Sequence, residues 1–121
     1  MIESVGSGCT KAAPPPEPKL YVLVRRDLPW PVRTVQATHA AMQLLQAHNH
    51  SGPSYCIRCM DWGPHGPAVV LLGVDTELTL ASWLAKLAGA VGFREPDLCD
   101  ALTAVAWYGE APAELSELRL M

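Results

Sequence analysis

Three short apolar runs rich in β-branched residues constrain the fold of this chain more than any other feature. They cover residues 20–24 (LYVLV), 68–74 (AVVLLGV) and 102–107 (LTAVAW). Apolar runs without polar alternation are typical of strands that are buried on both faces. Because a helical segment separates the first two runs, we expect these two strands to be parallel and joined by a right-handed crossover.

Hydrophobic periodicity predicts a helix over residues 32–48. Alanine, leucine, valine and methionine fill one broad arc of this helix, and the opposite narrow arc carries Gln36, His39, Gln43 and Gln46. A polar arc without any charged residue is unusual for a face that is merely solvated. This arc is therefore a candidate functional surface.

A second helix is expected after the second strand. Thr76 or Thr79 can cap its start, and we expect it to run to about Val91 and to end at Gly92. A short strand at 93–95, a polar turn at 96–100 and a last short helix from Pro112 to about Leu118 complete the domain. The order predicts an α/β fold with a small mixed sheet of about four strands, the last two forming an antiparallel edge.

The domain is expected to occupy residues 19–121. Residues 1–18 contain Gly6-Ser7-Gly8 and a Pro14–Pro18 stretch, and they predict an extended tail that buries no face. Residues 48–67 contain three Gly-Pro pairs and predict one long loop, with a short helical turn near 54–59. Loops of this length within a compact domain are more often functional than accidental.

Composition limits the class of protein. Half of the 121 residues are hydrophobic and 17% are charged, which excludes a fully disordered chain. No apolar run is long enough to span a bilayer, and the first residues do not form a secretory signal, so we expect a cytoplasmic protein with reduced cysteines. The net charge is −3, but residues 1–60 carry +3 and residues 61–121 carry −6. Arg25, Arg26 and Arg33 could form a basic patch in the first half, although such arginines are usually solvated.

The sequence Cys56-Ile57-Arg58-Cys59 is a possible zinc-binding motif. His48, His50 and His65 flank it, and two thiolates with two imidazoles could complete a tetrahedral site. A single CxxC with irregular histidine spacing is a weak signal, and ordinary loop cysteines are the favoured interpretation. No glycine-rich phosphate loop is present, so the sequence gives no support for nucleoside triphosphate chemistry.

Two further groups of polar residues have both a structural and a catalytic interpretation. His39 could be hydrogen-bonded at a helix–sheet boundary, or it could relay a proton to a substrate. Glu95, Asp97 and Asp100 could stabilise a turn, or one of them could orient a water molecule for hydrolysis. Thr103, at the start of the third run, could add a hydroxyl to such a site.

Three stretches together resemble a known family. They are residues 20–28 (LYVLVRRDL), 35–41 (VQATHAA), and 93–98 (FREPDL) with 102–106 (LTAVA). They resemble the type 2 peptidyl-tRNA hydrolases, most closely the small bacterial members, over residues 19–109. The resemblance implies a three-layer α/β/α fold with a four-stranded mixed sheet between helices. It also implies hydrolysis of the ester that joins a peptide to the 3′ end of tRNA, without a metal or other cofactor.

The resemblance assigns roles to particular residues. Gln36, His39, Asp97 and Thr103 are the expected catalytic residues: Asp97 orients the water, Gln36 and Thr103 stabilise the oxyanion, and His39 holds the site together or relays a proton. Arg25, Arg26, Arg33 and Thr38 are the expected substrate-binding residues, the arginines contacting the tRNA backbone. The chain departs from the family at Val32, where the family has lysine, and at Cys99, which occupies the ungapped position of the family aspartate.

Two alternatives to the hydrolase remain open on sequence alone. The missing lysine favours a catalytically weak or inactive tRNA-binding protein on the same fold. The CxxC motif favours a zinc-stabilised interaction module. We expect tRNA as the partner and no membrane association, and the sequence leaves a homodimer open.

Overall fold

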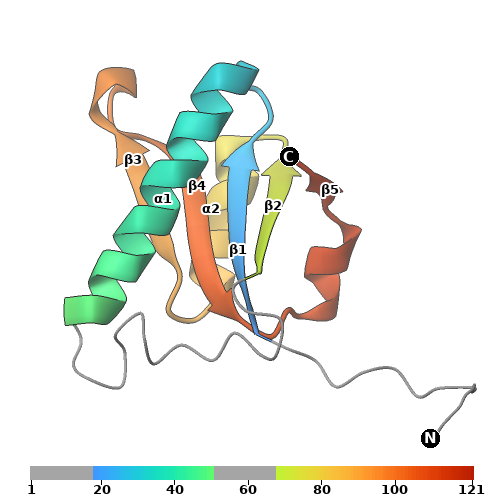
Figure 1. The fold of residues 1–121 in the computed structure, drawn as a ribbon. Helices are drawn as coiled ribbons and strands as arrows, with labels where there is room; N and C mark the ends of the chain where they lie inside the picture. The colour runs from blue at the N-terminus through green and yellow to red at the C-terminus, as the bar shows by residue number, and fades with distance from the viewer. Residues whose placement is uncertain (1–17, 51–67) are drawn as a thin grey trace, which may run out of the picture.

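A computed structural model describes residues 18–50 and 68–121 of the chain (Figure 1). Its main elements are β1 (Lys19–Arg25), α1 (Trp30–His50), β2 (Val69–Val74), α2 (Glu77–Lys86), β3 (Val91–Glu95), β4 (Ala101–Gly109) and β5 (Arg119–Leu120). Two short 3₁₀ helices, η3 (Pro96–Leu98) and η4 (Ala113–Glu117), precede β4 and β5.

The strands form one mixed open sheet in the order β3-β4-β1-β2-β5. β1 and β2 are parallel, and every other neighbouring pair is antiparallel. The predicted α/β class, the parallel pair and the antiparallel edge are therefore confirmed. Within the described residues the sheet has five strands and not about four. The additional strand, β5, is two residues long and too short to show any alternation in the sequence.

The two helices pack against opposite faces of the sheet (Figure 1). Val22, Val24, Ala37, Ala40 and Leu44 are part of the core between α1 and the sheet. The core on the α2 side contains a larger set, including Leu23, Leu72, Leu80, Trp83 and Leu115. Strand side chains alternate between these two cores, which explains why the central strands are apolar throughout.

The helix boundaries differ from the sequence prediction at both helices. α1 begins at Trp30 and continues to His50, so residues 48–50 are helical and not part of a loop. α2 is capped by Thr76, whose side chain accepts a hydrogen bond from the Thr79 amide, but it ends at Lys86. The turn that follows contains Gly89 with φ of 85°, so Gly89 and not Gly92 supplies the left-handed conformation. The predicted last helix is the 3₁₀ helix η4.

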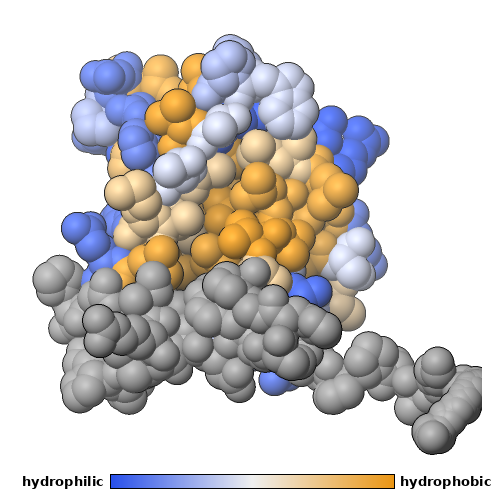
Figure 2. Space-filling view, viewed as in Figure 1, coloured by the Kyte–Doolittle hydropathy of each residue, from blue (hydrophilic) through white to orange (hydrophobic). Residues whose placement is uncertain are grey.

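α1 leaves part of its face of the sheet uncovered. The helix packs on β4, β1 and β3, and an apolar groove of about 230 Å³ lies beside it, lined by residues of α1, β1, β2 and the C-terminal Met121. Figure 2 shows this hydrophobic surface at the centre of the face seen in Figure 1. Val69 and Leu71 of β2, at 56% and 37% exposure, belong to it.

Some predictions concern residues outside the described ranges. These are the extended tail, apart from Pro18, and the loop at 51–67 with the possible zinc ligands Cys56, Cys59 and His65. Within residues 18–50 and 68–121, neither helix combines the length and apolar character that a membrane span requires.

Candidate functional site

A chain of side-chain hydrogen bonds joins α1 to β3 and β4. The Thr103 hydroxyl donates to Oε1 of Gln36 at 2.6 Å, and Nε2 of Gln36 donates to Oε1 of Glu95 at 2.8 Å. Gln36 is 3% exposed and Thr103 is completely buried. We call Thr103, Gln36 and Glu95 the Gln36 network. Because a hydroxyl proton fixes the amide oxygen, the amide nitrogen must face the carboxylate.

An irregularity in β4 brings Thr103 into this network. Phe93 pairs with Ala104 but Arg94 pairs with Leu102, so Thr103 is an additional residue in β4. Leu102 and Val105 lie in the core on the α2 side, whereas Ala104 packs on the α1 side and Thr103 bonds to α1. Thr103 and Ala104 therefore both face α1, as a β-bulge allows. No local feature of the sequence signals this bulge.

Glu95 occupies the end of β3, where its side chain has two fixed partners. Besides Gln36, the backbone N–H of Asp97 donates to Oε2 of Glu95 at 3.2 Å, which caps η3. The hydrogen bond from Gln36, the bond from the Asp97 amide and the charge of His39 together lower the pKa of Glu95. The carboxylate is therefore ionised at neutral pH, and it remains partly accessible to solvent.

His39 lies one helical turn beyond Gln36 and packs against β3. Its imidazole is tilted against the Phe93 ring, with 4.6 Å between ring centroids. Nδ1 of His39 is buried and has no hydrogen-bond partner among the described residues. A concavity of about 330 Å³ opens here, lined by His39, Met42, Gln43, Gln46 and Phe93. Three members of the predicted polar arc of α1 thus line one hollow beside the Gln36 network.

The structure places the expected catalytic residues differently from the sequence interpretation. Gln36 and Thr103 do meet, but both are buried and bonded within the network. Asp97 is exposed and contributes its backbone N–H, whereas the carboxylate in contact with Gln36 belongs to Glu95. The carboxylate that Gln36 contacts is therefore that of Glu95, and the catalytic role expected of Asp97 stays a prediction. Pro96 and the 3₁₀ turn carry the Asp97 side chain past the end of the strand, so the carboxylate that stays in register is the earlier one.

The three arginines expected to bind substrate lie around the end of β1 and the β1–α1 turn, and two of them are bonded within the protein. Arg25 forms a bidentate pair with Asp27 at 2.9 and 3.0 Å, lies 3.7 Å from Glu77, and donates to the Leu102 carbonyl. The hydrogen bond with Arg25 lowers the pKa of Asp27. Arg25 therefore ties the end of β1 to its surroundings and is not free to bind a ligand.

Arg33 and Thr38 also have structural roles. The Arg33 guanidinium donates to the carbonyls of Leu28 and Arg26 and lies 4.5 Å above the Trp30 ring, so it closes the β1–α1 turn. Thr38 is exposed, donates to the Thr34 carbonyl and lines the apolar groove. Of the three predicted arginines, only Arg26 has a side chain without a hydrogen-bond or ion-pair partner among the described residues.

Sequence reasoning underestimated Glu95. It was one of three acidic residues in the predicted turn, and nothing in the spacing singled it out. Its position at the end of an edge strand, directly before proline, is the signal that could have found it, because that residue is still held by the sheet.

Comparison with known proteins gives no family: no family model matches the chain, and no curated protein matches it. Among the described residues, no three His, Cys, Asp or Glu side chains come together in a way that could hold a metal ion.

Proposed function

We propose that this protein is a hydrolase of peptidyl-tRNA or of N-blocked aminoacyl-tRNA. The observation that carries the proposal is the hydrogen-bonded chain from Thr103 through Gln36 to Glu95. It holds one ionised carboxylate in a fixed orientation at the surface. A hollow lined by His39 and Phe93 follows Gln36 along α1 and precedes Glu95 along β3. An oriented carboxylate is the group that ester hydrolysis needs to position a water molecule.

In the proposed mechanism Glu95 binds and orients the attacking water. Each carboxylate oxygen accepts one bond from the protein and retains a lone pair for the water. The water oxygen attacks the ester carbonyl carbon, and its proton passes to Glu95. Cleavage of the bond to the ribose oxygen then releases a peptide carboxylate, and the ribose oxygen takes the proton from Glu95 to become a free hydroxyl.

Gln36 and Thr103 act as positioning residues in this mechanism. Their polar groups are already engaged with each other and with Glu95, and neither side chain has the exposure that contact with a substrate requires. The remaining side chain suited to the developing oxyanion is His39, because a protonated imidazole donates from both ring nitrogens.

The hollow beside Glu95 suits a neutral group of the substrate. Phe93, Met42 and the His39 ring supply apolar surface, and Gln43 and Gln46 supply amide donors and acceptors. An acyl side chain or the terminal base of the tRNA could lie there next to the ester.

The family resemblance supports the same function. Two of the stretches that carry it, residues 35–41 and residues 93–98 with 102–106, supply all three members of the Gln36 network. A three-layer fold of the type 2 peptidyl-tRNA hydrolases would place helices on both faces of a mixed sheet, as seen here. We therefore also propose tRNA as partner and the cytoplasm as the place of action.

A catalytically inactive tRNA-binding protein is the second candidate. One observation favours it: Val32 stands where the family has lysine, and its neighbour Arg33 is bound to two backbone carbonyls. Arg33 is the only lysine or arginine of α1, so this helix offers no unbonded Lys or Arg to support the transition state, which predicts slow turnover.

The test is release of the free amino acid or peptide from N-blocked aminoacyl-tRNA by protein treated with a chelator. We expect release above the rate of the buffer blank at micromolar enzyme, with the tRNA left intact. A rate equal to the blank, with tRNA still bound, would replace the hydrolase with the binding protein. Restoration of the family residue by Val32→Lys is expected to raise the rate.

A further inference from the structure

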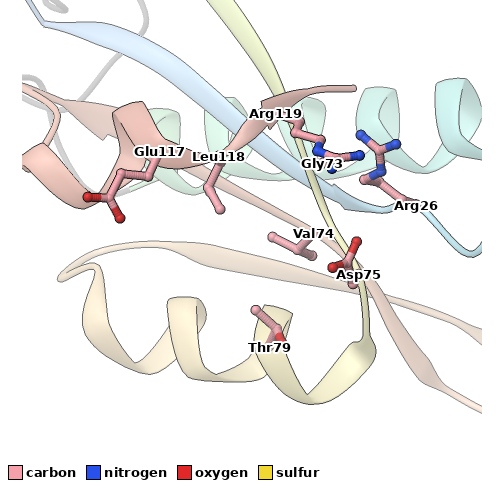
Figure 3. A pocket seen from close by; sticks show the side chains of 8 residues that line it. All are labelled: Arg26, Gly73, Val74, Asp75, Thr79, Glu117, Leu118 and Arg119. Carbon is pink, nitrogen blue, oxygen red and sulfur yellow. The ribbon is translucent and has the colours of Figure 1, made fainter.

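A second pocket lies on the other side of β1 from the Gln36 network. It has a volume of about 250 Å³ and is formed where β2 ends, between the start of α2 and β5 (Figure 3). We call it the arginine pocket. Its lining residues are Arg26, Gly73, Val74, Asp75, Thr79, Glu117, Leu118 and Arg119. In α/β sheets, ligands commonly bind beyond the carboxyl ends of parallel strands, and β1 and β2 both end here.

Arg26 is held across β2 because residue 73 is glycine. A Cβ atom at Gly73 would lie 2.5 Å from Cγ and 2.7 Å from Cδ of Arg26, and 3.7 Å from its Nη1. These distances show that the aliphatic stem of Arg26 rests directly on the Gly73 backbone. Any side chain at this position would displace it.

Arg119 reaches the same place from the other side. It is the register partner of Gly73 in the β2–β5 pair. Figure 3 shows the guanidinium groups of Arg26 and Arg119 at one end of the pocket, close to Gly73. Among the described residues neither group forms an ion pair or donates a side-chain hydrogen bond. Two unneutralised like charges that share one pocket repel each other, and a bound anion would relieve that repulsion.

The carboxylates of the pocket do not neutralise this end. Glu117 lies at the opposite end of the pocket in Figure 3. Asp75 lies at the same end as the arginines, at the end of β2, but it forms no ion pair with either of them. Asp75 should weaken the binding of an anion by its negative charge, without occupying the space between the guanidinium groups.

We infer that Arg26 and Arg119 form a phosphate-binding site over Gly73. Guanidinium groups bind phosphate oxygens with paired, charge-assisted hydrogen bonds, and two of them can contact different oxygens of one phosphate. The backbone of β2 forms the floor, and the missing side chain of Gly73 leaves room for the stem of Arg26, which lies across the strand. The phosphate could belong to an RNA backbone or to a small phosphorylated molecule. The inference does not depend on hydrolase activity.

Titration of the full chain with inorganic phosphate at low ionic strength tests the inference. Binding is monitored through the NMR signal of the backbone amide of residue 73. We expect saturable binding that Arg119→Gln weakens about tenfold. Gly73→Ala should weaken it similarly, although it removes no charge, because it displaces Arg26. Asp75→Asn should tighten it. Arg94→Gln, with the same change of charge on the distant strand β3, is the control and should leave the affinity unchanged.

Three results would overturn the inference. They are no saturable binding at millimolar phosphate, equal loss in Arg94→Gln and Arg119→Gln, or unchanged affinity in Gly73→Ala when that variant is folded. Competition then distinguishes the two sources of phosphate. If a short RNA displaces inorganic phosphate and a nucleoside monophosphate does so only weakly, the site binds the RNA backbone. The reverse order identifies a small phosphorylated ligand. Because none of these measurements requires turnover, failure of the hydrolase proposal would leave them interpretable.

Discussion

The polar side chains on the two sides of β1 differ in whether they have hydrogen-bond or ion-pair partners. On the side of β4 and β3, Thr103, Gln36 and Glu95 bond to one another, and the two residues nearest the core are buried. On the side of β2 and β5, Arg26, Asp75, Glu117 and Arg119 line one pocket without an ion pair among the described residues. Satisfied polar groups fix the position of a neighbour, whereas charged groups without partners are available to a ligand. The same sheet thus supports a positioning network and an open binding site.

The largest effect on stability should come from breaking the Gln36 network. In Thr103→Val, Oε1 of buried Gln36 loses its donor, and we expect the free energy of unfolding to fall by about 1–3 kcal/mol. Thr103→Ser keeps the hydroxyl and should recover most of that loss. Chemical denaturation of both variants measures the difference, and equal stability of the valine and serine variants would show that the hydroxyl does not matter.

A substitution in the arginine pocket should, by contrast, change the free energy of unfolding very little. Arg119→Gln removes a charge that has no ionic partner in the described structure, so we expect the free energy of unfolding to change by no more than about 0.5 kcal/mol. Denaturation under the conditions used for Thr103→Val checks this. A loss as large as that of Thr103→Val would mean that Arg119 stabilises the fold and is not held for a ligand.

The ion pair of Arg25 should have an intermediate effect on stability. Arg25 lies at the end of β1 next to Arg26, but it is paired with Asp27. Asp27→Asn should cost less than about 1 kcal/mol, because Asp27 is 47% exposed and water screens the pair. The measurement is again chemical denaturation, with and without added salt. The difference in the free energy of unfolding between wild type and Asp27→Asn should shrink at high salt. A difference that salt does not change would contradict an ionic origin.

The smallest expected effect is a pH dependence that originates at Glu95. Its pKa is lowered in the folded state from an ordinary value of 4.5. The unfolded chain therefore binds the proton first, and the stabilising contribution, which is complete above 4.5, is lost as the pH falls through the folded pKa. Glu95→Gln should lack this loss, so the stabilities of the two proteins should converge in acid. Thermal unfolding between neutral and acid pH measures this, and parallel pH profiles would contradict the lowered pKa.

The sequence predicted the elements that hydrophobic pattern controls. β1, β2, β4 and both helices follow from apolar runs and periodicity, and the sequence motifs point to Gln36 and Thr103 without showing that the two side chains meet. The β-bulge at Thr103 and the two-residue strand β5 could not be predicted, because both depend on pairing between distant segments. The same limit explains why the sequence does not single out Glu95 among the three acidic residues of its turn and does not point to Arg119. Glu95 and Arg119 gain their roles from partners far away in the sequence, Gln36 and Gly73.

We propose that Glu95, positioned by Gln36, orients the water for ester hydrolysis. Two variants with the same change of charge, two residues apart, test it: Glu95→Gln and Asp97→Asn. Single-turnover hydrolysis of N-blocked aminoacyl-tRNA should slow about a hundredfold or more in Glu95→Gln. Asp97→Asn retains the backbone N–H that bonds to Glu95, and its rate should stay within a few-fold of wild type. A large loss in Asp97→Asn with little change in Glu95→Gln would contradict the account.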